Sequence, residues 1–177
     1  MSGQCFEVPP MSRASIRQLA RQVRDSLGWK EPRFPIVEYL EVYHQIDKAF
    51  VYDICEKELM GDRHGITFPD KKVMLIREDV YEGAVDGNGR DRMTIAHEFG
   101  HLHMHTNLGL GRQLASSEIP AFRSSEWQAN CFGGELLVSS DHIHQCLDPL
   151  EASQIFEVSV EAAIYQWGKF NEDGVIK

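Results

Sequence analysis

The sequence predicts an α+β fold, in which a small three-stranded antiparallel sheet lies beside a helical core and a helical C-terminal tail follows. Two observations carry this prediction. Apolar residues recur every three or four positions over several long segments, as they do on the buried face of a helix. Between residues 49 and 76, short runs rich in β-branched and aromatic residues alternate with turn residues instead. With 177 residues, 42% of them hydrophobic, we expect a single domain over residues 1–177.

The first forty residues predict an irregular lead-in and then two helices. Residues 1–11 contain two prolines and no periodic pattern, whereas residues 12–140 are expected to form the core. Ser12 is suited to cap a helix that ends at Gly28, and Pro35 can begin a second helix. The first helix has a basic face, which we interpret as solvated, with a docking surface for an acidic partner as the alternative; it carries Arg13, Arg17, Arg21 and Arg24.

Three strands are predicted in the next segment, at residues 49–57, 65–68 and 73–76. Gly61-Asp62 and Pro69-Asp70 supply the turn residues between them. Consecutive strands joined by short turns fit an antiparallel meander.

The most informative motif is His97-Glu98-Phe99-Gly100-His101, an H-E-x-x-H sequence on a helix predicted over roughly residues 91–106. Asp91 follows a Gly-Asn-Gly loop and is the expected N-cap of this helix. On a helix, His97 and His101 lie on one face, four residues apart, and can bind the same zinc ion. Glu98 is then close enough to act as a base toward water at that ion.

A catalytic zinc ion usually takes a third protein ligand. His105 continues the four-residue spacing, but it lies about 12 Å along the helix from His97, too far for both rings to reach one ion. We therefore expect His105 to support the site or to lie in the core, and His103 to point to a different face. The third ligand should come from another helix.

The helix predicted over residues 124–137 offers two carboxylates, Glu126 and Glu135, which point to opposite sides of it. The Gly133-Gly134 pair costs helix stability, about 1 kcal/mol per glycine, and indicates close approach of another backbone. We interpret that backbone as the H-E-x-x-H helix, which favours Glu126 as the third ligand. Asn130, one turn after Glu126, is expected to orient a ligand.

Two blocks of the sequence resemble the ImmA/IrrE family of metallopeptidases: Arg92-Met93-Thr94-Ile95-Ala96 followed by H-E-x-x-H, and Glu126-x-x-Ala129-Asn130-x-Phe132-x-x-Glu135-Leu136-Leu137. The resemblance implies a zincin-like core, with His97, His101 and Glu126 as zinc ligands and Glu98 as catalytic base. The usual partners of that family are helix-turn-helix repressors. One departure is Val138-Ser139-Ser140, where the family often has Met-Pro, and it predicts a different end to the helix.

The remaining segments are a connector and a tail. Residues 107–123, with Gly109, Gly111 and Pro120, are expected to join the two ligand helices and to border the site. The tail, residues 141–177, is expected to hold two or three short helices. The last runs from about Ser159 to Phe170, with an apolar stripe of Val160, Ala163, Ile164 and Trp167.

Composition excludes several classes of function. A net charge of −9 argues against direct binding of nucleic acid. No stretch approaches the length of a membrane span, and no apolar run near the start resembles a secretory signal. The four cysteines show no C-x-x-C pair and are expected to be reduced thiols. We expect a cytoplasmic protein without membrane partners.

The sequence therefore predicts a zinc-dependent endopeptidase that cleaves or inactivates a helix-turn-helix repressor or an antitoxin. Tyr81, His103 and His105 are candidates for the oxyanion donor, and the sequence does not rank them. In small zinc peptidases an edge strand commonly pairs with the substrate backbone. Manganese or iron would also suit two histidines and a carboxylate. The main alternative is a non-proteolytic regulator or toxin that binds a repressor or antitoxin and keeps a structural or vestigial metal site; hydrolysis of another kind of bond is a third.

Overall fold

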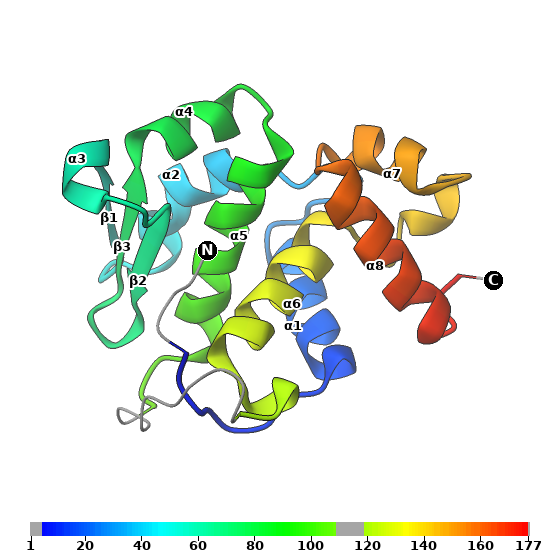
Figure 1. Ribbon diagram of the computed structural model, residues 1–177, viewed down its shortest axis with the longest axis horizontal. Helices are drawn as coiled ribbons and strands as arrows, with labels where there is room; N and C mark the ends of the chain where they lie inside the picture. The colour runs from blue at the N-terminus through cyan, green and yellow to red at the C-terminus, as the bar shows by residue number, and fades with distance from the viewer. Residues whose placement is uncertain (1–4, 109–118, 177) are drawn as a thin grey trace.

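In the computed structural model, which describes residues 5–108 and 119–176, the fold is α+β, as the sequence predicts. Two long helices, α5 (Gly89–Met104) and α6 (Ser125–Leu137), lie against each other at the centre (Figure 1). The sheet lies with α2, α3 and α4 on the α5 side, and α1, α7 and α8 lie on the α6 side. The described residues form eight α-helices, of which the others are α1 (Arg13–Ser26), α2 (Ile36–Ile46), α3 (Lys57–Met60), α4 (Glu78–Val85), α7 (Pro149–Phe156) and α8 (Val160–Glu172).

The sheet is mixed, with the strand order β1-β3-β2, where β1 is Val51–Cys55, β2 is Gly65–Phe68 and β3 is Val73–Arg77. Strands β2 and β3 are antiparallel, as predicted, but β1 and β3 are parallel, so the predicted antiparallel meander is wrong for β1. After β1 the chain forms α3 and then enters β2 on the far side of β3, so β1 and β2 never pair. A parallel pair needs a crossover of this kind, and a run of strand-forming residues does not report strand direction.

The basic face of α1 packs against the rest of the protein, so its interpretation as a solvated face is wrong. The Glu135 side chain of α6 is fully buried and lies 2.9 Å from Nε of Arg17 and 3.4 Å from Nη1 of Arg13. Arg24 is also buried, and it donates to the carbonyl of Leu136. Only Arg21 is substantially exposed, where it pairs with Asp141 at the surface. A buried carboxylate requires charged partners, and the sequence does not show which helix that carboxylate faces.

Helix α5 begins earlier than expected. The N-cap is Asn88, whose Oδ1 accepts hydrogen bonds from the backbone N–H groups of Arg90 and Asp91, so the predicted cap at Asp91 is wrong. Asp91 lies in the first turn instead, where a carboxylate faces the positive end of the helix. Helix α6 is capped by Ser124, which accepts from the N–H of Trp127.

Glycines allow α5 and α6 to approach each other closely. A Cβ atom at Gly133 would lie 3.2 Å from the backbone nitrogen of His97, and one at Gly100 would lie 2.9 Å from Cα of Ala129. The approach that Gly133 predicts is therefore confirmed, whereas Gly134 faces Gln166 of α8. This approach brings the first turn of α6 next to the middle of α5. The core around the two helices contains fully buried side chains of Ile95, Phe99, Phe132 and Leu136.

The tail differs from its prediction in the register of its last helix. Ala163, Gln166 and Phe170 are the buried residues of α8, whereas Val160 and Ile164 are 44% and 56% exposed. One of the buried positions of α8 holds a polar residue, Gln166, which packs against Gly134 of α6. A pattern of apolar residues cannot predict a buried position that is occupied by a polar side chain. In the part of the chain that the structure describes, no helix combines the length and hydropathy needed to cross a membrane.

Candidate metal centre

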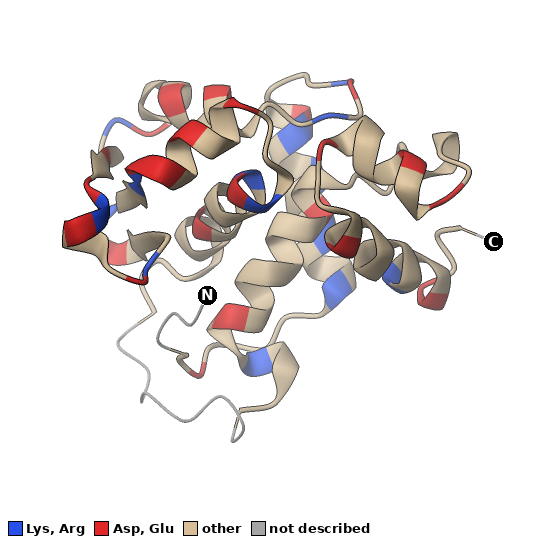
Figure 2. Ribbon diagram, turned by 45° about the horizontal axis from the view of Figure 1, so that its top comes forward, with Lys and Arg blue, Asp and Glu red and all other residues tan. Residues whose placement is uncertain are grey.

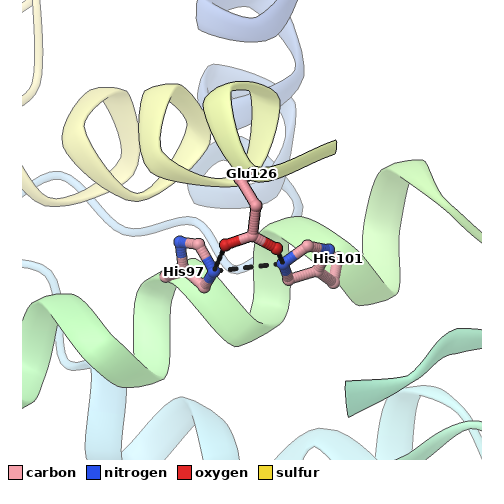
Figure 3. Close-up of side chains that lie close together, drawn as sticks. All are labelled: His97, His101 and Glu126. Atoms are coloured by element: carbon pink, nitrogen blue, oxygen red, sulfur yellow. Dashed lines mark hydrogen bonds and ion pairs between the residues drawn. The ribbon is translucent and has the colours of Figure 1, made fainter. Parts of the chain in front are cut away.

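Three ligand groups converge between α5 and α6 (Figure 3). His97 and His101 come from α5, and their Nε2 atoms lie 3.0 Å apart. Glu126, from the first turn of α6, has one oxygen 3.6 Å from Nε2 of His97 and the other 3.3 Å from Nε2 of His101. Atoms bound at about 2.05 Å to a tetrahedral zinc ion lie about 3.3 Å apart. The three separations are therefore those of atoms that share one ion.

Hydrogen bonds behind His101 determine which of its ring nitrogens carries the proton. The Nε2 atom of Gln128 lies 2.8 Å and 2.9 Å from the backbone oxygens of Pro9 and Phe122, and carbonyl oxygens only accept. Oε1 of Gln128 must then accept from Nε2 of His105, 3.1 Å away. Nδ1 of His105 consequently accepts from Nδ1 of His101, at 3.0 Å. This arrangement leaves Nε2 of His101 without a proton and free to bind a metal ion.

His97 is held in the same way, because its Nδ1 atom lies 2.9 Å from Oδ1 of Asn130 and donates to it. Two nitrogen lone pairs and one carboxylate then face a common point, where they repel one another unless a cation lies between them. The residues therefore fit a divalent metal ion. Two histidines and a carboxylate form a catalytic zinc set, and outer hydrogen bonds of this kind orient metal-binding histidines.

The charge states of these groups suit a cation. Burial and the neighbouring His101 lower the pKa of His97 to about 4, so its imidazole is neutral at pH 7, the form that binds metal. For Glu126, burial acts to raise the pKa, but the neighbouring imidazoles of His101 and His97 outweigh it, and the pKa falls below its ordinary value. Glu126 is therefore ionised at neutral pH.

Glu98 lies beside the centre but faces the sheet. Its side chain is buried, which raises its pKa above the ordinary value. The Thr67 hydroxyl of β2 donates to Oε2 of Glu98 at 2.7 Å, and the backbone N–H of Thr67 also donates to this carboxylate. A Cβ atom at Gly65 would lie 2.8 Å from Cγ of Glu98. Strand β2 thus fixes the carboxylate of Glu98 from one side.

A cleft of about 790 Å³ opens onto this centre. Strand β2 lines it together with residues 62–64 and 69–71, and Phe6, Glu7 and Val8 of the N-terminal segment line it as well. The helices contribute Thr94, His97, Glu98, His101, His105, Ser125 and Glu126 to its lining.

Strand β2 is an edge strand with backbone groups directed away from β3. The N–H of Arg77 donates to the carbonyl of His64, so His64, Ile66 and Phe68 point their backbone groups toward β3. The backbone groups of Gly65 and Thr67 therefore point outward. The Thr67 N–H is used by Glu98, and the other outward groups are directed toward the side where an added strand would pair.

The structure does not bring all the predicted site residues to the cleft. The Tyr81 hydroxyl donates to Glu41 on α2, and His103 lies among Tyr39, Phe99 and other aromatic rings, so neither lines the cleft. His105 does line it, but both of its ring nitrogens are hydrogen-bonded. None of the three predicted oxyanion donors can thus donate to a substrate in the cleft without first breaking a hydrogen bond. The rival ligand Glu135 faces α1, on the other side of α6. Of the predicted connector, Gly109 and Gly111 lie outside the described residues.

Sequence reasoning missed three contributors, namely Gly65, Thr67 and Gln128. Gly65 and Thr67 alternate on one strand and so share a face, a signal that becomes useful only once that strand is known to lie over Glu98. Gln128 had no distinguishing signal, because a glutamine near the start of a helix is usually exposed. The predicted irregular lead-in also has a defined place, because Glu7 forms a β-bridge with Ser124.

The fold and the site together define a class, the metallopeptidase-like proteins in which an H-E-x-x-H helix and a glutamate from a second helix share one metal ion. The family model of the IrrE N-terminal-like domain, Peptidase_M78, matches residues 57–167, which is more than half of the chain. The chain therefore belongs to this peptidase family, and the resemblance to ImmA/IrrE proteins is confirmed. A comparison with curated proteins gives no match.

His103 is expected to make folding sensitive to acid. Burial lowers its pKa to about 4, against about 6.5 in an unfolded chain. Between these values the unfolded state binds a proton that the folded state does not, so stability falls as the pH drops from 6.5 toward 4. At pH 5 the loss from this residue should be about 2 kcal/mol. Urea unfolding of wild type and His103→Phe at pH 7 and pH 5 measures it. An equal loss in both proteins would contradict the assignment.

Gly65→Ala is expected to lower hydrolytic activity without changing the affinity for metal. The added Cβ would overlap Cγ of Glu98, which is buried and cannot move aside without shifting its carboxylate. If Glu98 serves as a general base, hydrolytic activity should fall at least tenfold, at the low end of what such a base contributes, while zinc affinity stays unchanged. Activity assays and chelator competition on the same protein measure the two effects. Gly168→Ala, where a Cβ would meet nothing within 4 Å, is the control.

Proposed function

We propose that this chain is a zinc-dependent endopeptidase. The observation that carries the proposal is the position of Glu98, a buried carboxylate that lines the same cleft as His97, His101 and Glu126 and accepts a hydrogen bond from the edge strand β2. A merely structural metal site has no need of a buried carboxylate next to its ligands, because burying that charge costs free energy. His97, His101 and Glu126 would hold the ion and leave its fourth position for water or substrate.

Each residue then has a separate task. When bound, the ion lowers the pKa of a coordinated water and polarises the scissile carbonyl. Glu98 accepts a proton from the attacking water and passes it to the nitrogen of the leaving amine. Burial raises the pKa of Glu98, which favours its holding that proton between the two steps. Thr67 keeps the carboxylate directed while this happens.

The substrate is proposed to bind as an extended chain along β2. The outward carbonyls of Gly65 and Thr67 and the N–H of Gly65 would pair with its backbone. Such pairing is independent of side chains and would place a peptide bond beside His97, His101 and Glu126. Extended, locally unfolded segments of a partner protein are the substrates that this geometry suits.

The partner is proposed to be a helix-turn-helix repressor or an antitoxin. The resemblance to the ImmA/IrrE family implies this class, and the charge of the chain is compatible with it. Figure 2 shows acidic residues along the helices at the sheet end of the molecule, and the whole chain carries a net charge of −9. DNA-binding proteins are basic, so opposite charges would speed the encounter.

The test is cleavage of candidate repressors and antitoxins by the zinc-loaded chain, with fragments identified by mass spectrometry. We expect a small number of cuts that disappear when a chelator removes the metal and return when zinc is restored. The main alternative is a regulator that acts by binding alone. Partner inactivation without fragments, and unchanged in Glu98→Gln, would support that alternative and overturn the peptidase proposal.

A further inference from the structure

The metal centre is connected to the N-terminal segment (residues 5–11) through buried side chains. This segment runs beside the start of α6: the N–H of Val8 donates to the carbonyl of Arg123 at 2.8 Å, and that of Met11 donates to the carbonyl of Phe122 at 2.9 Å. Its residues Phe6, Glu7 and Val8 also line the cleft. The segment is therefore close to the substrate path and tied to the helix that carries Glu126.

Gln128 is the junction between this segment and the histidines. It is 1% exposed, and its amide nitrogen bridges the carbonyls of Pro9 and Phe122. Its oxygen accepts from His105, which is also buried and has no ring nitrogen left over. An unbroken series of hydrogen bonds with assigned donors and acceptors thus runs from the carbonyl of Pro9 through Gln128 and His105 to Nδ1 of His101.

We propose that Gln128 and His105 are positioning residues that couple the N-terminal segment to His101, so that the affinity for metal depends on how this segment is seated. The inference rests on the proposed metal site but not on peptidase activity. If the Gln128 amide is lost, nothing fixes the proton of His105 on Nε2. His105 can then donate from Nδ1, and His101 can carry its proton on Nε2, the atom that must be free to bind the ion.

The test compares the zinc affinity of wild type and Gln128→Leu by competition with a chromophoric chelator. Loss of an outer hydrogen-bond partner typically weakens metal binding about 10–100-fold, and we expect a loss in this range. Gln166→Leu is the matched control. It makes the same change at another buried glutamine, 2% exposed, which packs against Gly134 of α6. The control should stay within about twofold of wild type. Equal affinities for Gln128→Leu and wild type, or equal losses in both variants, would overturn the proposal.

A double-variant cycle tests whether the two residues act in series. His105→Phe alone should weaken zinc binding at least as much as Gln128→Leu, because it removes the partner of His101 directly. Adding Gln128→Leu to His105→Phe should then cost less than about twofold more, since residues in one path are not additive. Full additivity would show that Gln128 acts by another route and would refute the coupling.

Hydrogen exchange in the unmodified protein provides a second measurement that needs no variant. Coupling between two sites is reciprocal, so zinc should protect the segment as the segment supports zinc. We expect slower exchange of the Val8 and Met11 amides when zinc is added, with no change at Phe170 on α8. Exchange that zinc leaves unaltered at Val8 and Met11 would overturn the coupling to the segment.

These outcomes separate the inference from the proposed function. If wild type binds zinc but cleaves no partner, the peptidase proposal fails and the coupling is still tested by affinity. If wild type binds zinc and cleaves a partner while Gln128→Leu binds zinc equally well, only the coupling fails. If wild type binds no divalent metal, both fail.

Discussion

Replacing Glu98 with glutamine is expected to lower partner cleavage about 10²–10⁴-fold, the contribution of a general base, while zinc content stays at the wild-type level. The change keeps the shape of the side chain, and its oxygen can still accept from Thr67, but an amide cannot take a proton from water. Melting temperature should be unchanged or higher, because a buried neutral amide replaces a group whose charged form burial disfavours.

The control for Glu98→Gln is Glu161→Gln, which makes the same change at an exposed residue in the first turn of α8. Among the described residues, those that line the cleft do not include Glu161. The control should therefore cleave at close to the wild-type rate. Cleavage by Glu98→Gln at the wild-type rate would remove Glu98 from the mechanism, and with it the peptidase proposal in its present form.

Replacing Glu126 with alanine is expected to have the largest effect on metal binding. It removes one of three ligands and leaves two neutral imidazoles, whose Nε2 atoms lie 3.0 Å apart, with no negative charge to balance the ion. The loss of zinc affinity should exceed the roughly 10–100-fold cost of losing an outer partner. Chelator competition measures it, and activity should fall with metal occupancy.

Glu126 is 19% exposed at its side chain and lies in the first turn of α6, so its removal should leave the helix and the core intact. Circular dichroism and melting of the metal-free proteins check this, again with Glu161→Gln as the comparison. A zinc affinity within tenfold of wild type in Glu126→Ala would mean that another group supplies the third ligand.

The sequence predicts those site residues whose arrangement depends on the geometry of a single helix. A helix brings positions four apart to one face, whatever surrounds it, so the spacing predicts the pair His97 and His101, with Glu98 next to it. The same helical geometry, together with the glycines that indicate close approach, favours Glu126 over Glu135, and the structure brings Glu126 to the two histidines.

What the sequence could not provide depends on contacts between distant segments. Thr67 meets Glu98 across 31 positions, and Gln128 meets Pro9 across 119. The ion pair of Arg17 depends on the position of Glu135 on a different helix. The direction of β1 relative to β3 depends on the path of the chain through α3, which a strand pattern does not encode.

Glu126 and Glu135 occupy opposite sides of α6, and both are engaged by charged or polar groups of other helices. A rotation of α6 about its own axis would separate Glu135 from Arg13 and Arg17. These ion pairs, on the side of α6 that faces away from the cleft, therefore oppose rotation of the helix. Glu126, on the side of α6 that lines the cleft, is held in its orientation by the same ion pairs. An incoming ion therefore meets a ligand set that is already oriented, and its uptake should require little rearrangement of the backbone.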